Sequence, residues 1–201
     1  PARPAPYAAF TEEMRDSHVI LAPQMSPIHF DLLETVFATL GYRLVLLPEA
    51  DRGAIDEGVR YVNNDACYPS LIVIGQLIQA LKSGKYDLNK TSVVITQTGG
   101  GCRATNYIAL LRKAIREAGF SQVPVISISP NGMEEHPGFK LDNKFLKTAI
   151  QGLIYGDVLM KVLHRVRPYE LYPGSANELY HKWIERCREQ LSNKSKQSFK
   201  A

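Results

Sequence analysis

Two of the three cysteines stand where helices are expected to begin, and a thiol in such a place can do chemistry. Cys102 follows the glycine run 99–101, and Cys67 precedes Tyr68-Pro69. Glycines let the chain turn through positive φ and let a bulky ligand approach bare N–H groups. The positive end of a helix favours a thiolate. Each cysteine is therefore a candidate nucleophile, redox thiol or iron ligand.

The elements around both cysteines predict that they lie close together. A short apolar β-branched run predicts a strand over 92–96, with a helix beginning near Ala104 after Cys102. A second strand is expected over 59–63, with a helix over 70–82 after Cys67. Ligands of parallel sheets bind beyond the carboxyl ends of the strands. We therefore expect one site on Cys67 and Cys102, surrounded by Asn64, Asp65, Gly99, Gly100, Gly101, Arg103 and Asn106.

The rest of the chain predicts an α/β fold. Further strands are expected over 19–22, 44–47 and 123–128, and a helix over 26–41. About five strands alternating with helices indicate an open parallel sheet of flavodoxin or Rossmann type.

The domain organisation expected from this pattern has three parts. Residues 1–18 form an irregular N-terminal arm, residues 19–142 the α/β domain with both cysteine turns, and residues 143–201 a helical extension with a polar tail. Helices are expected over 145–165 and 176–191. The Pro- and Ala-rich beginning suggests a fragment of a larger protein.

Composition and charge exclude several classes of function. The chain has 201 residues and a formal net charge of +4, with three lysines in its tail and no basic patch interleaved with aromatics. Nucleic acid is therefore not an expected partner. The longest apolar run, 71–74, is too short to cross a bilayer, so we expect a cytoplasmic protein and no membrane. The cysteine spacing fits neither a CxxC pair nor a zinc ribbon.

Several candidate residues also have a purely structural explanation. Cys187 falls on one helical stripe with Leu179, Trp183 and Leu191, which favours burial over ligation. Arg103 could pair with an anionic ligand or simply face solvent.

Two loops leave similar alternatives open. Asn64 and Asp65 could serve the site or only make the turn. His136, beside Glu134 and Glu135, could be an acid/base or metal group or part of a solvated polar loop. The glycine run could cradle a phosphate or the diphosphate of coenzyme A, although it lacks the P-loop ending.

The chain contains five short sequence motifs that are informative together. The motifs are Tyr61-Val-Asn-Asn-Asp-Ala-Cys-Tyr-Pro, Gly75-Gln76, Gln97-Thr-Gly-Gly-Gly-Cys-Arg-Ala-Thr-Asn-Tyr, Pro137-Gly-Phe-Lys and Arg167-Pro-Tyr-Glu. Together they are similar to the 2-hydroxyacyl-CoA dehydratase family, and the similarity covers most of the chain, from about Val19 to Tyr180. More closely, they resemble the dehydratase-like region of large proteins that fuse it to an ATP-dependent activase for CoA-substrate enzymes.

This resemblance implies an iron–sulfur cluster on cysteines at helix starts and an electron from an ATP-driven activator. Dehydratases of the family use that electron to eliminate water from a 2-hydroxyacyl-CoA. Cys67 and Cys102 match the expected ligands, and a third cysteine at a comparable turn is not evident. The third ligand would then be a non-cysteine group, Cys187, or a group from sequence beyond this chain or from another subunit.

The sequence thus supports three hypotheses. The first is a domain with a 4Fe–4S or larger cluster, acting in low-potential electron transfer or reductive activation of a CoA-ester dehydratase. Its partners would be an activase or dehydratase subunit, or a second copy in a homodimer. The second is a cluster-free domain that binds an acyl-CoA ester or a partner, and the third is a Cys67–Cys102 dithiol switch.

Overall fold

The computed structural model describes residues 7–63, 65–96, 106–128 and 136–192, and these form two compact units. The α/β unit consists of the described residues of Pro1–Met25 and Tyr42–Lys140. The helical unit consists of Ser26–Gly41 and the described residues of Leu141–Ala201.

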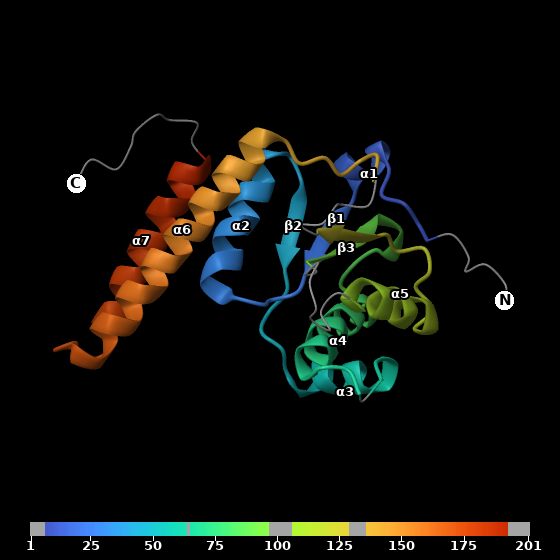
Figure 1. Cartoon of the computed structure of the whole chain (residues 1–201), viewed down its shortest axis with the longest axis horizontal. Coiled ribbons are helices and arrows are strands. Elements are labelled where there is room, and N and C mark those ends of the chain that lie inside the picture. Colours follow the sequence, from blue (N-terminus) through green and yellow to red (C-terminus); the bar gives the residue numbers. More distant parts are fainter. Residues whose placement is uncertain (1–6, 64, 97–105, 129–135, 193–201) are drawn as a thin grey trace. The chain divides into compact units, whose positions relative to one another are not determined.

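A four-stranded parallel sheet forms the centre of the α/β unit, in the order β2-β1-β3-β4. The strands are short, and Leu21 of β1 lies in register with Val45 of β2 and Val93 of β3. The predicted open parallel α/β sheet is confirmed (Figure 1). The strands are β1 (Val19–Ala22), β2 (Arg43–Leu46), β3 (Thr91–Thr96) and β4 (Val125–Ile128).

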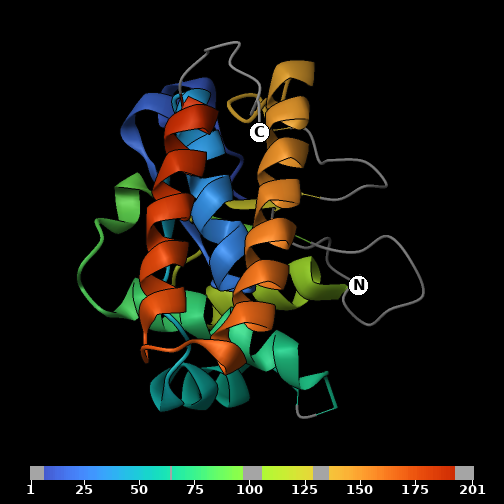
Figure 2. The ribbon, with the colours of Figure 1, turned by 90° about the vertical axis from the view of Figure 1, so that its left-hand side faces the viewer.

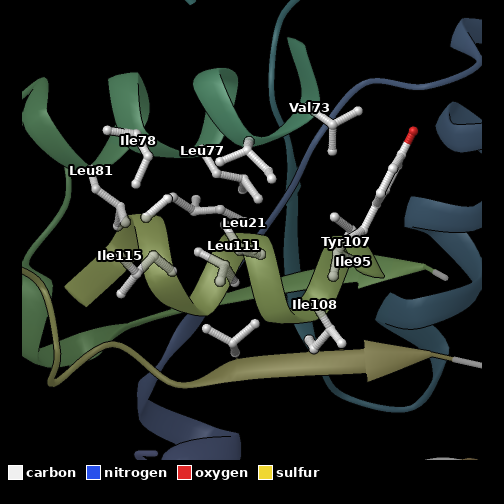
Figure 3. Close-up of a cluster of buried hydrophobic side chains, with 14 of the residues drawn as sticks. Leu21, Val73, Leu77, Ile78, Leu81, Ile95, Tyr107, Ile108, Leu111 and Ile115 are labelled. Carbon is white, nitrogen blue, oxygen red and sulfur yellow. The ribbon is translucent and has the colours of Figure 1, made fainter. Parts of the chain in front are cut away.

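Helices α4 (Tyr68–Lys82) and α5 (Tyr107–Glu117) pack their apolar sides against the sheet. Leu77 of α4, Leu111 of α5 and Ile95 of β3 are fully or almost fully buried in one cluster (Figure 3). Such burial contributes about 1.5–3 kcal/mol for each large side chain. This core fixes the ends of α4 and α5 relative to the strands.

The expected strand over 59–63 is wrong, because this stretch ends the helix α3 (Arg52–Tyr61). The Asp51 side chain caps α3 by accepting a hydrogen bond from the Ala54 N–H at 2.9 Å. Ala54 and Gly58 form the buried side of the helix at a four-residue spacing. The described chain therefore has four strands where the sequence predicts about five.

The N-terminal segment, expected to be irregular, contains the short helix α1 (Glu12–Ser17). Two acidic residues in its first turn favour the positive end of the helix. Phe10 just before α1 is fully buried. Its ring packs edge-on against the ring of Phe139, with the two ring centroids 6.4 Å apart. This contact attaches the segment to the residues that follow β4. A 3-10 turn, η1 (Leu88–Lys90), leads into β3.

Three helices make up the helical unit: α2 (Pro27–Thr39), α6 (Asn143–Val166) and α7 (Ser175–Ser192). They lie side by side, with α6 and α7 antiparallel and joined through η3 (Arg167–Tyr169) (Figure 2). The expected helices over 26–41, 145–165 and 176–191 are thus confirmed within a few residues at each end. Among the residues described, no helix combines the length and apolarity needed to span a membrane.

Candidate functional site

Cys67 is the N-cap residue of α4, a helix of 15 residues. Its side chain is half-buried, and its carbonyl accepts hydrogen bonds from the Ser70 N–H and hydroxyl at 2.9 and 2.7 Å. Pro69 stands in the first turn, where a missing N–H costs no helical hydrogen bond. The local sequence therefore places the thiol at the positive end of the helix.

Tyr107, the first residue of α5, reaches the same thiol. Its hydroxyl oxygen lies 3.2 Å from the Cys67 Sγ, while its ring is buried. Figure 3 shows Tyr107 at the start of α5, with its hydroxyl pointing away from the apolar core. The beginnings of α4 and α5 thus meet through this side-chain contact.

Hydrogen bonding lowers the pKa of the Cys67 thiol below its usual value. The largest cause is the Tyr107 hydroxyl, which donates to the thiolate, and hydrogen bonds involving Ser70 and the Cys67 backbone add to it. Partial burial acts in the opposite direction and is outweighed. A lowered thiol pKa favours the thiolate, which is the form that binds soft metals and acts as a nucleophile.

The glycine–cysteine motif lies outside the described residues. Gly99, Gly100, Gly101, Cys102 and Arg103 belong to the connection between Thr96, which ends β3, and Asn106, the N-cap of α5. The predicted pairing of Cys67 with Cys102 therefore stays a prediction. What the structure adds is the Tyr107 contact, which brings the helix following Cys102 to the Cys67 thiol.

Local hydrogen bonds to Asn63 stabilise the turn before Cys67. The Asp65 N–H donates to the Asn63 side-chain oxygen at 3.2 Å, and the Ala66 N–H donates to the Asn63 carbonyl at 2.9 Å. This pattern is typical of asparagine in turns. Asn64 lies outside the described residues, and Asn106 is exposed without a side-chain cap hydrogen bond.

Two glycines let α3 approach α4 closely and so fix the position of Cys67. A Cβ atom on Gly75 of α4 would overlap the Ala54 carbonyl oxygen, and one on Gly58 of α3 would overlap the Leu71 carbonyl oxygen. Only glycine fits such backbone contacts. The sequence signal for this crossing is the pair of glycines: Gly75 belongs to the Gly75-Gln76 motif, whereas no local pattern marks Gly58 as a contact between helices.

Cys187 is buried on α7, and burial raises the pKa of its thiol. The prediction that it faces the core is confirmed. The stripe proposed for it is wrong in part, because Leu179 and Trp183 are exposed, at 52% and 37%. Ile184 and Leu191 form the buried side with Cys187 instead.

His136 is buried, so a solvated position is wrong for this residue. Its Nδ1 accepts a hydrogen bond from the Phe10 N–H at 3.2 Å. His136 thus joins the N-terminal segment to the chain after β4. Glu134 and Glu135 lie outside the described residues.

A serine, a histidine and an aspartate meet in the helical unit, which the sequence does not predict. His29 Nδ1 lies 2.9 Å from the Ser26 hydroxyl, and His29 Nε2 lies 3.0 Å from the Asp157 carboxylate. Ser26 is only three residues before His29, and the Asp157 side chain is 72% exposed. This arrangement joins the start of α2 to the middle of α6, where Gly156 makes room for the imidazole ring.

Within the part of the chain that the structure describes, no three His, Cys, Asp or Glu side chains are placed to hold a metal ion together. The donor set there consists of one well-suited thiol, Cys67. A metal or cluster at this site therefore needs ligands in addition to it.

Residues 28–88 match a family model described as a CoA enzyme activase uncharacterised domain. The matched stretch begins in α2 and ends in η1, so it contains Cys67 and the α3–α4 crossing but not Cys102. It relates the chain to CoA enzyme activase proteins over less than half of its length. No curated protein and no solved structure matches the chain.

Proposed function

We propose that the α/β unit holds an iron–sulfur group on Cys67 and Cys102. The unit would serve in low-potential electron transfer to, or reductive activation of, a CoA-ester dehydratase. Its partner would be an ATP-dependent activase or a dehydratase subunit. The observation that carries the proposal is the Cys67 thiol at the start of α4, in contact with Tyr107 at the start of α5.

The chemistry of the donors supports this proposal. Iron–sulfur clusters are held by thiolates, and the pKa of Cys67 is lowered by the Tyr107 hydroxyl. Cys102 precedes Tyr107 by five residues, and five residues of extended chain span at most about 18 Å. The chain therefore permits both sulfurs to reach one site. The match to CoA enzyme activase proteins supports a role of this site in the activation of a CoA-ester enzyme.

Each residue of the site has a distinct task in this proposal. A bound cluster would supply an electron at low potential. Tyr107 would hold the Cys67 sulfur in its thiolate form, and the N-terminus of α4 would stabilise the negative charge. Two thiolates do not complete the coordination of a cluster, so the proposal includes a further ligand from another subunit or from a non-cysteine group.

Anaerobic reconstitution of the chain with iron and sulfide tests the proposal. We expect stoichiometric iron and sulfide and an EPR signal after reduction, both lost in Cys67→Ser and Cys102→Ser. Cys187→Ser serves as the matched control, because this cysteine is buried on another helix. Absence of retained iron, or equal iron in all three variants, would contradict the proposal.

A second candidate is a reversible disulfide between Cys67 and Cys102. The Cys67 thiol is half-buried and has a lowered pKa. These properties favour disulfide formation, since such thiols react readily with mild oxidants. In this case diamide oxidises the chain to a Cys67–Cys102 disulfide and no iron is retained. An acyl-CoA-binding domain would instead retain CoA, and neither iron nor disulfide.

A further inference from the structure

Helix α6 carries a row of apolar side chains on its solvent side. Six of them follow one another at every fourth residue and are 45–56% exposed. We call these six the α6 ridge: Leu146, Ile150, Ile154, Val158, Val162 and Val166. At 1.5 Å per residue the ridge is about 30 Å long. Exposed apolar surface of this extent is typical of an interaction site.

The α6 ridge is not needed for packing inside the helical unit. Helix α6 contacts α2 and α7 through a different side. There the ring centroids of Phe145 and Phe37 lie 4.9 Å apart, and Gly152 faces Val36. The buried residues of α6 are Phe145, Ala149, Gly152, Gly156 and Leu163. The ridge can therefore bind a partner without any change in this packing.

The exposed charges of α6 are mostly positive. The basic residues of α6 are Lys144, Lys147, Lys161 and Arg165, all exposed, and its one acidic residue is Asp157. None of these four cations has an ion-pair partner among the described residues, and Asp157 already contacts His29. A partner with carboxylates beside its apolar row would complement this surface.

The same charges disfavour a second copy of this chain as the occupant. Pairing two α6 helices in either direction places basic side chains against basic side chains, which costs binding energy.

The geometry of the ridge disfavours a lipid surface. A step of four residues turns by about 40° around a helix of 3.6 residues per turn, so the six residues turn by about 200° in all. A flat bilayer surface touches only one side of a helix lying on it, whereas rows at four-residue spacing fit the grooves of a crossing helix.

We propose that the α6 ridge is the docking site for an amphipathic helix of another protein, with an apolar row flanked by aspartate or glutamate. Two helices that interdigitate their four-residue rows cross at about 50°. The contact then centres on the middle of the ridge, at Ile154 and Val158, where Lys161, one turn beyond Val158, is the nearest cation of α6. The side chains at its ends, Leu146 and Val166, contribute less.

Two synthetic helical peptides test this proposal with the full 201-residue chain. Both carry leucine at every fourth position, one with glutamate and the other with lysine at the flanking positions. Fluorescence anisotropy measures their binding, and circular dichroism verifies the fold of each variant. We expect the glutamate peptide to bind at least about tenfold more tightly than the lysine peptide.

Three variants locate the binding site. Ile154→Asn should weaken binding of the glutamate peptide by about tenfold or more. Leu179→Asn is the matched control, because Leu179 is 52% exposed on α7 and lies off the ridge. Lys161→Glu leaves the apolar row intact and should shift the preference toward the lysine peptide.

Three results would overturn the proposal. The first is that the wild-type chain fails to bind the glutamate peptide or binds both peptides equally. The second is binding to vesicles of phosphatidylcholine and phosphatidylglycerol in equal parts that Ile154→Asn abolishes. The third is self-association in sedimentation equilibrium that depends on Ile154.

Discussion

Replacing Gly75 by alanine should destabilise the α/β unit, although alanine is the better helix former. The new Cβ would overlap the Ala54 carbonyl oxygen and lie 2.8 Å from the Gly58 nitrogen. These are backbone atoms, which cannot turn aside as a side chain can, so α3 and α4 must separate. Overpacking costs about 1–3 kcal/mol, and a clash against backbone atoms lies in the upper part of this range, at about 2–3 kcal/mol. The helix propensity of alanine returns about 1 kcal/mol. We therefore expect the free energy of unfolding to fall by about 1–2 kcal/mol.

Urea unfolding measures this change, and Gly152→Ala is the matched control. Gly152 is also a buried helical glycine, but its nearest neighbours lie at 3.6, 3.7 and 3.9 Å, which is ordinary van der Waals contact. This substitution should raise the free energy of unfolding by up to about 1 kcal/mol. An unchanged or raised stability of Gly75→Ala would refute the close crossing of α3 and α4. So would an equal loss in both variants.

Three further predictions concern single substitutions. Tyr107→Phe removes the hydrogen bond to the thiolate and raises the pKa of Cys67, so iodoacetamide should alkylate Cys67 more slowly at neutral pH; an unchanged rate would contradict the contact. Burial lowers the pKa of His18 below its unfolded value, so the unfolded state takes up the proton first and stability should fall as the pH drops below about 6.5. His18→Gln should flatten this part of a urea-unfolding pH profile, and an equally steep profile would exclude His18 as its source. Gly156→Ala places a Cβ 2.5 Å from the His29 ring and should break its two hydrogen bonds, with a net loss of about 1 kcal/mol in urea unfolding; unaltered stability would show that the ring moves without cost.

The sheet could be predicted from the sequence because its strands are short apolar runs closed by turn residues. The runs beginning at Val19 and Ser92 lie in β1 and β3. Helix α3 could not be predicted in the same way. Gly53 and Gly58 weaken its helical pattern, and the alternation around Val59 and Tyr61 imitates a strand. The reason for Gly58 is the close approach of α4, a tertiary contact that no local pattern reveals.

The candidate site could be predicted only in part. The sequence marks Cys67 as a thiol at a helix start, and the structure places it at the N-cap of α4. The hydroxyl that lowers its pKa comes from Tyr107, 40 residues further along the chain, and no local pattern links this residue to Cys67. The arrangement of Ser26, His29 and Asp157 could not be predicted as a whole, because Asp157 lies 128 residues from His29.

The most direct test of the central claim, that Cys67 and Cys102 share one site, is a crosslinking measurement on the metal-free chain. Dibromobimane becomes fluorescent when it joins two neighbouring thiols, and a Cys187→Ser background leaves only these two cysteines. We expect a fluorescent intramolecular product that peptide mapping assigns to Cys67 and Cys102. Separate single adducts on the two cysteines, without fluorescence, would contradict the shared site.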